Sequence, residues 1–192
     1  LTLDLAFAPY YLTNLMGDAY MVAIQFPEAL PFVGEALKLA MTPMTKLSKG
    51  QIEQLEWLER GDVITSGLAR EYLPTIQRGS NPLALLDRVS TTREAVLRMA
   101  VGLYQRSRIQ AGRSVQKGGA WLSKDVDPTS DLAAWAVARR SLVDYVDTGP
   151  VARRLLSGLA FPFRKWFVDV PIVLARAAKD RPLWWSAAVL GP

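Results

Sequence analysis

The side chains in this chain that could perform chemistry are mainly carboxylates and guanidinium groups, because the sequence contains no histidine and no cysteine. These absences exclude Ser-His-Asp and Cys-His nucleophile systems, disulfide bonds, and zinc sites built from nitrogen and sulfur ligands. One carboxylate cluster, Asp125, Asp127 and Asp131, has a spacing compatible with a metal ion. It lacks the central glycine and terminal glutamate of a calcium loop. We therefore interpret these acids as residues that oppose a helix dipole, and we predict no metal and no cofactor.

Signatures of other enzyme classes are missing as well. No Gly-rich loop opens a Lys-Ser or Lys-Thr helix, so the sequence does not indicate nucleotide chemistry. A hydrolase would need a carboxylate pair such as Asp125 and Asp127 in one pocket, and the sequence does not place them there. We predict that the protein is not an enzyme.

Positive charge is concentrated in the second half of the chain. Residues 101–192 hold 14 basic and 7 acidic side chains, and ten of the 14 are arginine, which favours bidentate contact with phosphate. Two interpretations remain open: contact with duplex DNA, or a solvated helix face with weak ion pairs. The side chains that we predict to contact nucleic acid or a partner are Arg139, Arg140, Arg153, Arg154, Arg164, Lys165, Arg176 and Lys179.

Four of the six tryptophans form two pairs with different surroundings. Trp57 and Trp135 lie on amphipathic stripes, which predicts core packing. Trp184 and Trp185 lie in an uncharged tail, residues 182–192, that directly follows charged residues. This arrangement is typical of an interfacial anchor or a docking segment. The tail is therefore predicted to pack against another protein copy or against the lipid headgroup region.

The elements that must position these side chains are helices. Apolar residues recur at helical spacing nearly everywhere, which predicts a mainly α fold: a multi-helix domain with several short helices and one long helix over residues 83–113. A break near residues 90–92 would be compatible with the pattern. No basic region precedes the apolar N-terminal stretch, so a signal peptide is not indicated. Because the first residue is Leu1 and not methionine, we expect the chain to be a segment of a longer polypeptide.

Local signals predict where several helices begin and end. Ser48 and Gln51 have the spacing of a capping box, and the helix they open should end near Arg60, with Gly61 as a left-handed C-terminal residue. Asn81 is a predicted N-cap, and Pro128 is predicted to start a helix with Leu132, Trp135, Ala138 and Leu142 on its buried stripe.

The chain is expected to have two helical parts. We predict an N-terminal part over residues 1–115, a linker over residues 116–128 with a hinge at Gly118-Gly119, and a basic, aromatic-rich part over residues 129–192. The nearly uncharged stretch 5–27 is interrupted by Pro9, Asn14 and Asp18, so a buried core helix is favoured over a membrane span.

An aromatic corner with adjacent cations is predicted at residues 161–166. Phe161, Pro162 and Phe163 precede Arg164, Lys165 and Trp166. Because Pro162 fixes its own φ, it should set the entry angle of the next helix, while the two phenylalanines and Trp166 anchor that corner in the core.

Residues 133–182 contain an ordered series of short motifs: Asp144-Tyr145, a turn at Thr148, the pair Arg153-Arg154, Pro162-Phe163 and then Trp166. This order resembles the C-terminal region of large polyvalent-type virion proteins of tailed bacteriophages. Two further stretches are similar to the same family: residues 3–20, with Thr13 where the family pattern has arginine, and residues 92–112, which include Arg93.

This resemblance implies a non-enzymatic internal virion or DNA-ejection protein. Such a protein would lie in the virion interior or near the portal and tail, and would enter the host cell envelope as part of a conduit for genome delivery. Its implied partners are copies of itself in a ring or tube, portal or tail components, duplex DNA and the host membrane. The alternative from the residues alone is a helical peripheral-membrane or scaffold module without a viral role.

Overall fold

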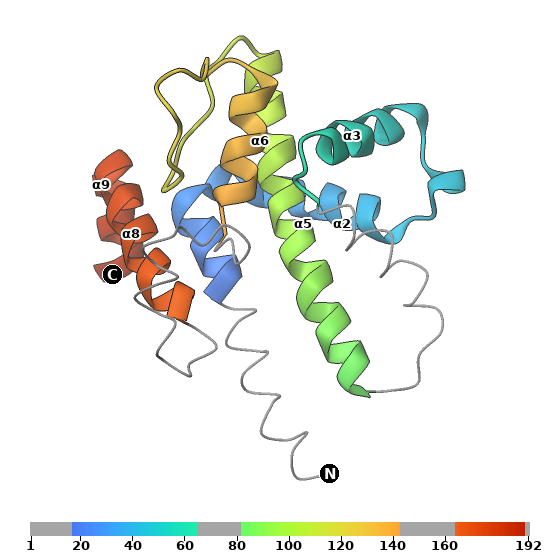
Figure 1. The fold of residues 1–192 in the computed structure, drawn as a ribbon, viewed down its shortest axis with the longest axis horizontal. Coiled ribbons are helices and arrows are strands. Elements are labelled where there is room, and N and C mark those ends of the chain that lie inside the picture. Colours follow the sequence, from blue (N-terminus) through green and yellow to red (C-terminus); the bar gives the residue numbers. More distant parts are fainter. Residues whose placement is uncertain (1–16, 65–81, 143–163, 191–192) are drawn as a thin grey trace.

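The computed structural model describes residues 17–64, 82–142 and 164–190 (Figure 1). All regular elements in these ranges are helices, which confirms the predicted mainly α multi-helix fold. Within these ranges, no helix combines the length and apolar character that crossing a membrane requires. The elements are a helix over residues 17–25, η1 (Pro27–Phe32), α2 (Val33–Met41), η2 (Met44–Lys46), α3 (Lys49–Arg60), α5 (Pro82–Gln110), α6 (Asp131–Arg140), α8 (Arg164–Asp180) and α9 (Pro182–Leu190).

The long helix α5 is the centre of the fold. Figure 1 shows it running between α6 on one side and α2 and α3 on the other. It continues without a break through residues 90–92. Its buried stripe contains Val96, Met99, Leu103 and Tyr104, all at most 7% exposed. Burying each such side chain contributes about 2 kcal/mol, so this stripe supplies a substantial part of the stability.

α6 packs on α5 through small side chains. Its buried residues are Ala133, Ala134, Val137 and Ala138. Leu132 was predicted on this stripe, but it is 54% exposed, and that prediction is wrong because the alanine face is turned toward the core.

The predicted start of α6 at Pro128 is also wrong, since the helix begins at Asp131. The reason is the cap. The Ser130 hydroxyl oxygen accepts from the Ala133 N–H at 3.2 Å, while Asp127 holds a preceding turn by accepting from the Thr129 N–H at 2.8 Å.

α3 begins and ends where predicted. The Ser48 hydroxyl accepts from the Gln51 N–H at 3.4 Å, and the Gln51 side chain accepts from the Ser48 N–H at 3.0 Å, which confirms the capping box. Gly61, however, has a φ of −82° and is not left-handed. The left-handed residue is Asp62, with a φ of 51°, and a glycine is needed at 61 because the Trp135 ring covers it.

The described part of the N-terminal apolar stretch is a core helix, as favoured above. Met21, Val22 and Ile24 are at most 5% exposed, and Gln25 is fully buried beside them. Phe26, which follows the helix, is also fully buried.

The Gly118-Gly119 pair, at which the sequence predicts a hinge, is buried in the core of the structure. A Cβ on Gly118 would lie 2.5 Å from the Phe26 ring, and one on Gly119 would lie 2.6 Å from the Val173 carbonyl oxygen. These glycines therefore permit close approach between segments. Core residues from both sides of the 116–128 segment, such as Leu103 and Val137, also belong to one hydrophobic cluster.

Gly119→Ala should destabilise the chain by about 1–3 kcal/mol, because the added methyl group must displace backbone or core atoms. The measurement is urea-induced unfolding. Gly34→Ala on α2 is the control, since a Cβ there meets nothing within 4 Å and should stabilise the helix by about 0.5–1 kcal/mol. Equal stability of Gly119→Ala and the unmodified chain would contradict the close packing.

Candidate functional site

The most constrained polar group in the described chain is the side-chain amide of Gln25. It is fully buried and contacts three separate segments. Its Nε2 donates to the carbonyl oxygens of Ser141 at 2.9 Å and Met21 at 3.1 Å. Its Oε1 accepts from the Gly119 N–H at 3.0 Å. Gln25 therefore ties its own helix to the end of α6 and to the loop that follows α5.

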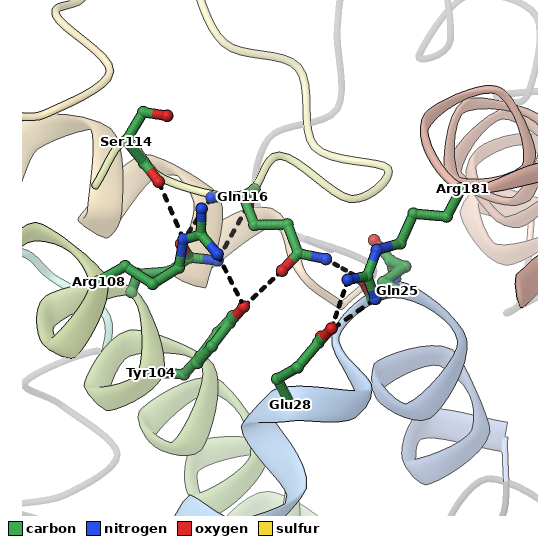
Figure 2. A network of polar contacts seen from close by, with 8 residues as sticks. Gln25, Glu28, Tyr104, Arg108, Ser114, Gln116 and Arg181 are labelled. Carbon is green, nitrogen blue, oxygen red and sulfur yellow. Dashed lines mark hydrogen bonds and ion pairs between the residues drawn. The ribbon is translucent and has the colours of Figure 1, made fainter. Parts of the chain in front are cut away.

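A second pair of amides extends this network (Figure 2). Gln105 and the Gln116 backbone exchange two hydrogen bonds of 2.9 Å, and Gln116 Nε2 donates to the Gln25 carbonyl oxygen at 3.3 Å. The Tyr104 hydroxyl donates to Gln116 Oε1 at 2.5 Å, and Arg108 donates to the Ser114 carbonyl oxygen at 2.9 Å. The sequence analysis missed this network, although Gln25 was visible as a polar residue inside an apolar run.

An ion pair attaches the C-terminal helices to the rest of the molecule. Both guanidinium nitrogens of Arg181 reach the Glu28 carboxylate, Nη1 at 3.1 Å from Oε2 and Nη2 in closer contact with Oε1 (Figure 2). Partial burial acts to raise the pKa of Glu28, but the hydrogen bonds and charge of Arg181, with further help from Arg108, outweigh it and lower this pKa below its ordinary value. The pair is therefore formed by a charged carboxylate at neutral pH.

The two C-terminal helices present both charge and apolar side chains to solvent. On α8, Ile172, Arg176 and Lys179 are exposed and share one face by their spacing, whereas Ala177 is buried. On α9, Leu183 is 87% exposed and Trp184 is 44% exposed. We call the set of Ile172, Arg176, Lys179, Leu183 and Trp184 the C-terminal surface.

The predicted tail residues Trp184 and Trp185 differ in their surroundings. Trp184 lines an open groove of about 580 Å³, together with Pro27, Glu28 and the first residues of α9. Trp185 is half-buried, and its indole N–H has no acceptor among the described residues. Of these two tryptophans, Trp184 is the one whose ring is exposed enough to contact another molecule.

The described cations of the predicted basic set do not form one patch. Arg139 and Arg140 are half-buried in the last turn of α6. Arg140 is occupied within the molecule, since it donates to the Trp121 carbonyl oxygen at 2.6 Å and lies 5.5 Å from the centre of that ring. Arg176 and Lys179 are exposed on α8.

The remaining predicted site residues are only partly covered by the structure. Arg153, Arg154, Phe161, Pro162 and Phe163 lie outside the described residues. Arg164, Lys165 and Trp166 lie in the first turn of α8, and their side chains lie outside the description.

Asp18 and Arg93, which belong to two different stretches of the predicted virion-family resemblance, are in contact. Arg93 on α5 forms an ion pair with Asp18, with 2.5 Å between Nη2 and Oδ2. Burial raises the pKa of the Asp18 carboxyl, and the attraction of Arg93 offsets only part of that effect. We nevertheless interpret the contact as a charged pair, because the geometry directs a guanidinium N–H at the carboxylate oxygen. This pair connects the helix over residues 17–25 to α5.

A second exposed apolar surface lies on α2 and η2, and the sequence analysis did not single it out. Leu37, Met41 and Met44 are 45%, 64% and 58% exposed. We call these three residues the methionine surface. Leu37 and Met41 share a face of α2 by their spacing of four. The apolar character of this helix was visible in the sequence, but its buried face, with Ala36 and Leu39, could not be distinguished from its exposed face.

The Asp125, Asp127 and Asp131 cluster is accounted for by local structure. Asp127 accepts from the backbone N–H and hydroxyl of Thr129, and these hydrogen bonds lower its pKa. Asp131 lies in the first turn of α6, where a carboxylate opposes the helix dipole. Among the described residues, no three acidic side chains are grouped so that they could hold a metal ion.

Gln25→Leu should lower the free energy of unfolding by about 2–5 kcal/mol. Leucine fills a similar volume but leaves the Gly119 N–H and the Ser141 carbonyl oxygen without their partner, and each lost buried partner costs about 1–3 kcal/mol. Urea titration followed by circular dichroism measures the change. Gln54→Leu is the matched control: Gln54 is only half-buried, donates to Glu35 alone and should change stability by less than about 1 kcal/mol.

The contact between Glu28 and Arg181 should weaken in acid. Because the pKa of Glu28 is lowered by folding, its contribution is complete above the ordinary glutamate pKa of about 4.3 and is lost as the pH falls through the lower value. The difference in unfolding free energy between the unmodified chain and Glu28→Gln should be below about 1 kcal/mol at pH 7, because solvent screens the exposed pair, and should decrease as the pH falls below about 4.3. Glu53→Gln, on the exposed face of α3, is the matched control for the loss of one surface carboxylate.

Comparison of the chain with protein-family models, with curated proteins and with solved structures gives no match.

Proposed function

We propose that this chain is a non-enzymatic structural module of a tailed-phage virion. In this proposal it is an internal or ejection protein that assembles near the portal or tail and contributes to a conduit for genome delivery across the host envelope. The proposal starts from the family resemblance in the sequence. The ion pair between Asp18 and Arg93 supports it, because it joins two stretches on which that resemblance depends.

The observation that carries the assembly role is the methionine surface. Leu37, Met41 and Met44 are large apolar side chains that the described chain leaves open to solvent. Methionine is flexible and polarisable, which suits a docking surface. Burying one such side chain at an interface contributes about 1.5–3 kcal/mol, so three of them supply the core of a specific contact.

We propose that a second copy of the chain covers this surface. When two different surfaces of neighbouring copies are in contact, each copy is rotated relative to the one before it. If a whole number of these rotations makes a full turn, the copies form a closed ring, and every copy's apolar side chains are buried. This form fits a conduit that surrounds a channel. Other virion proteins, such as portal or tail components, would bind the assembled ring.

Duplex DNA remains a proposed partner of the basic second half. Arg176 and Lys179 are the predicted cations whose described side chains are exposed, while Arg140 is held by Trp121. The proposed location is the virion interior or the portal and tail region, and then the host envelope after ejection. A helical scaffold without a viral role would use the same methionine surface, and particle composition separates the two.

Met41→Glu should raise the protein concentration required for assembly of the full chain at least tenfold, because it places a carboxylate in the proposed interface. Light scattering coupled to size exclusion measures the mass, and electron microscopy shows whether a symmetric ring forms. Thr45→Glu is the matched control, since Thr45 is an exposed polar residue of η2 beside the same surface. A chain that stays monomeric at all concentrations, or a Met41→Glu ring identical to that of the unmodified chain, would overturn the proposed assembly.

A further inference from the structure

The apolar character of α9 is unusual for a helix at the surface. Its sequence, PLWWSAAVL, has no charged residue, and serine is its most polar member. A helix that is apolar on all sides is normally buried. In this fold the described residues of α9 are exposed except for Trp185, which is half-buried. Something outside the described chain should therefore cover this helix.

We infer that α8 and α9 dock on an anionic lipid surface, with α9 lying in the headgroup region and with Arg176 and Lys179 at the lipid phosphates. This inference names the partner for the envelope stage of the proposed function and relies on that function for its biological setting. The lipid binding itself rests on the C-terminal surface alone.

Charge is the first reason to choose an anionic lipid surface over a second copy. Residues 164–190 hold five basic and two acidic side chains. Arg176 and Lys179 have no carboxylate partner among the described residues, whereas Arg181 is neutralised by Glu28. Lys179 lies four residues before Leu183, so the chain keeps the two Cα atoms within about 14 Å. Cations next to apolar side chains match the boundary between lipid phosphates and acyl chains.

Side-chain type and helix length give the second reason. Tryptophan favours the membrane interface, because its ring is apolar and its N–H can remain near water. Trp184 is 44% exposed, and Leu183 beside it is 87% exposed. α9 has nine residues, which corresponds to about 14 Å, whereas the hydrocarbon core is about 30 Å thick. The helix is therefore suited to lie in the interface instead of spanning the bilayer.

The contacts that attach α8 and α9 to the rest of the molecule give α9 a defined orientation. Arg181, between the two helices, is held by Glu28 on η1, and Val173 and Leu174 of α8 pack against the core. The open groove of about 580 Å³ beside Trp184 continues the apolar surface toward Pro27. Lipid contact thus needs no rearrangement of the described fold.

The test is sedimentation of the full chain with phosphatidylcholine vesicles that contain either no anionic lipid or about one third phosphatidylglycerol. We expect binding to the anionic vesicles that weakens with added salt. The double variant Leu183→Ser and Trp184→Ser should reduce this binding at least tenfold. The double variant Arg176→Gln and Lys179→Gln should reduce it about twenty-five-fold on anionic vesicles, or about fivefold per cation.

Matched controls separate lipid binding from other effects. Leu132→Ser removes an exposed apolar side chain, 54% exposed, from α6, and Lys46→Gln removes an exposed cation from η2. Both should bind vesicles as the unmodified chain does. Circular dichroism checks that each variant is folded, and quenching of tryptophan emission by brominated lipid, lost in Trp184→Phe, locates the contact.

Three outcomes would overturn the inference: no binding to anionic vesicles, equal binding by the serine double variant, or loss of oligomers instead of lipid binding in that variant. The last outcome would assign α9 to a second copy. Failure of the proposed assembly is distinguishable, because it would appear in Met41→Glu and in particle images while vesicle binding by the C-terminal surface persisted.

Discussion

The fold depends on one buried amide. The Gln25 side chain makes a hydrogen bond within its own helix and hydrogen bonds to two segments that lie far away in sequence, and it is fully buried. A buried amide is stable only if its donors and acceptor are all engaged. This requirement fixes the distance between the N-terminal helix, the end of α6 and the loop after α5 more tightly than apolar contacts alone would. The proposed surfaces are presented by elements whose positions this amide helps to determine.

Close backbone approach is the second constraint, and it follows from the first. Gly119 can donate to Gln25 only because no side chain separates its backbone from Val173. Gly102 similarly allows Leu58 to reach α5. The polar network and the glycines therefore act together, because a side chain at Gly119 would displace the backbone N–H that donates to Gln25.

The sequence predicted the features that local chemistry decides. The capping box at Ser48, the long helix over most of its range, and the buried stripe from Val96 to Tyr104 all follow from spacing and side-chain type. Predictions about features that depend on tertiary packing were wrong in several places, and other such features were not predicted. A Gly-Gly pair has the same sequence signature in a hinge and at a close approach, and only the position of Phe26 distinguishes them. The direction of the α6 stripe and the exposed side of α2 likewise depend on which neighbour each helix meets.

The tryptophans differ in their surroundings, so their circular dichroism and fluorescence report on different parts of the molecule. Trp57 and Trp135 lie 5.5 Å apart at a tilt of 49°, close enough for their excited states to couple, and Arg106 lies 5.3 Å from the Trp57 ring. Trp121 and Trp184 are 57% and 44% exposed and emit from a polar environment. Near-ultraviolet circular dichroism will therefore report mainly on the packing of α3 against α6, while the red edge of tryptophan emission reports on the surface. The unmodified chain thus carries separate spectroscopic signals for its interior and its exterior.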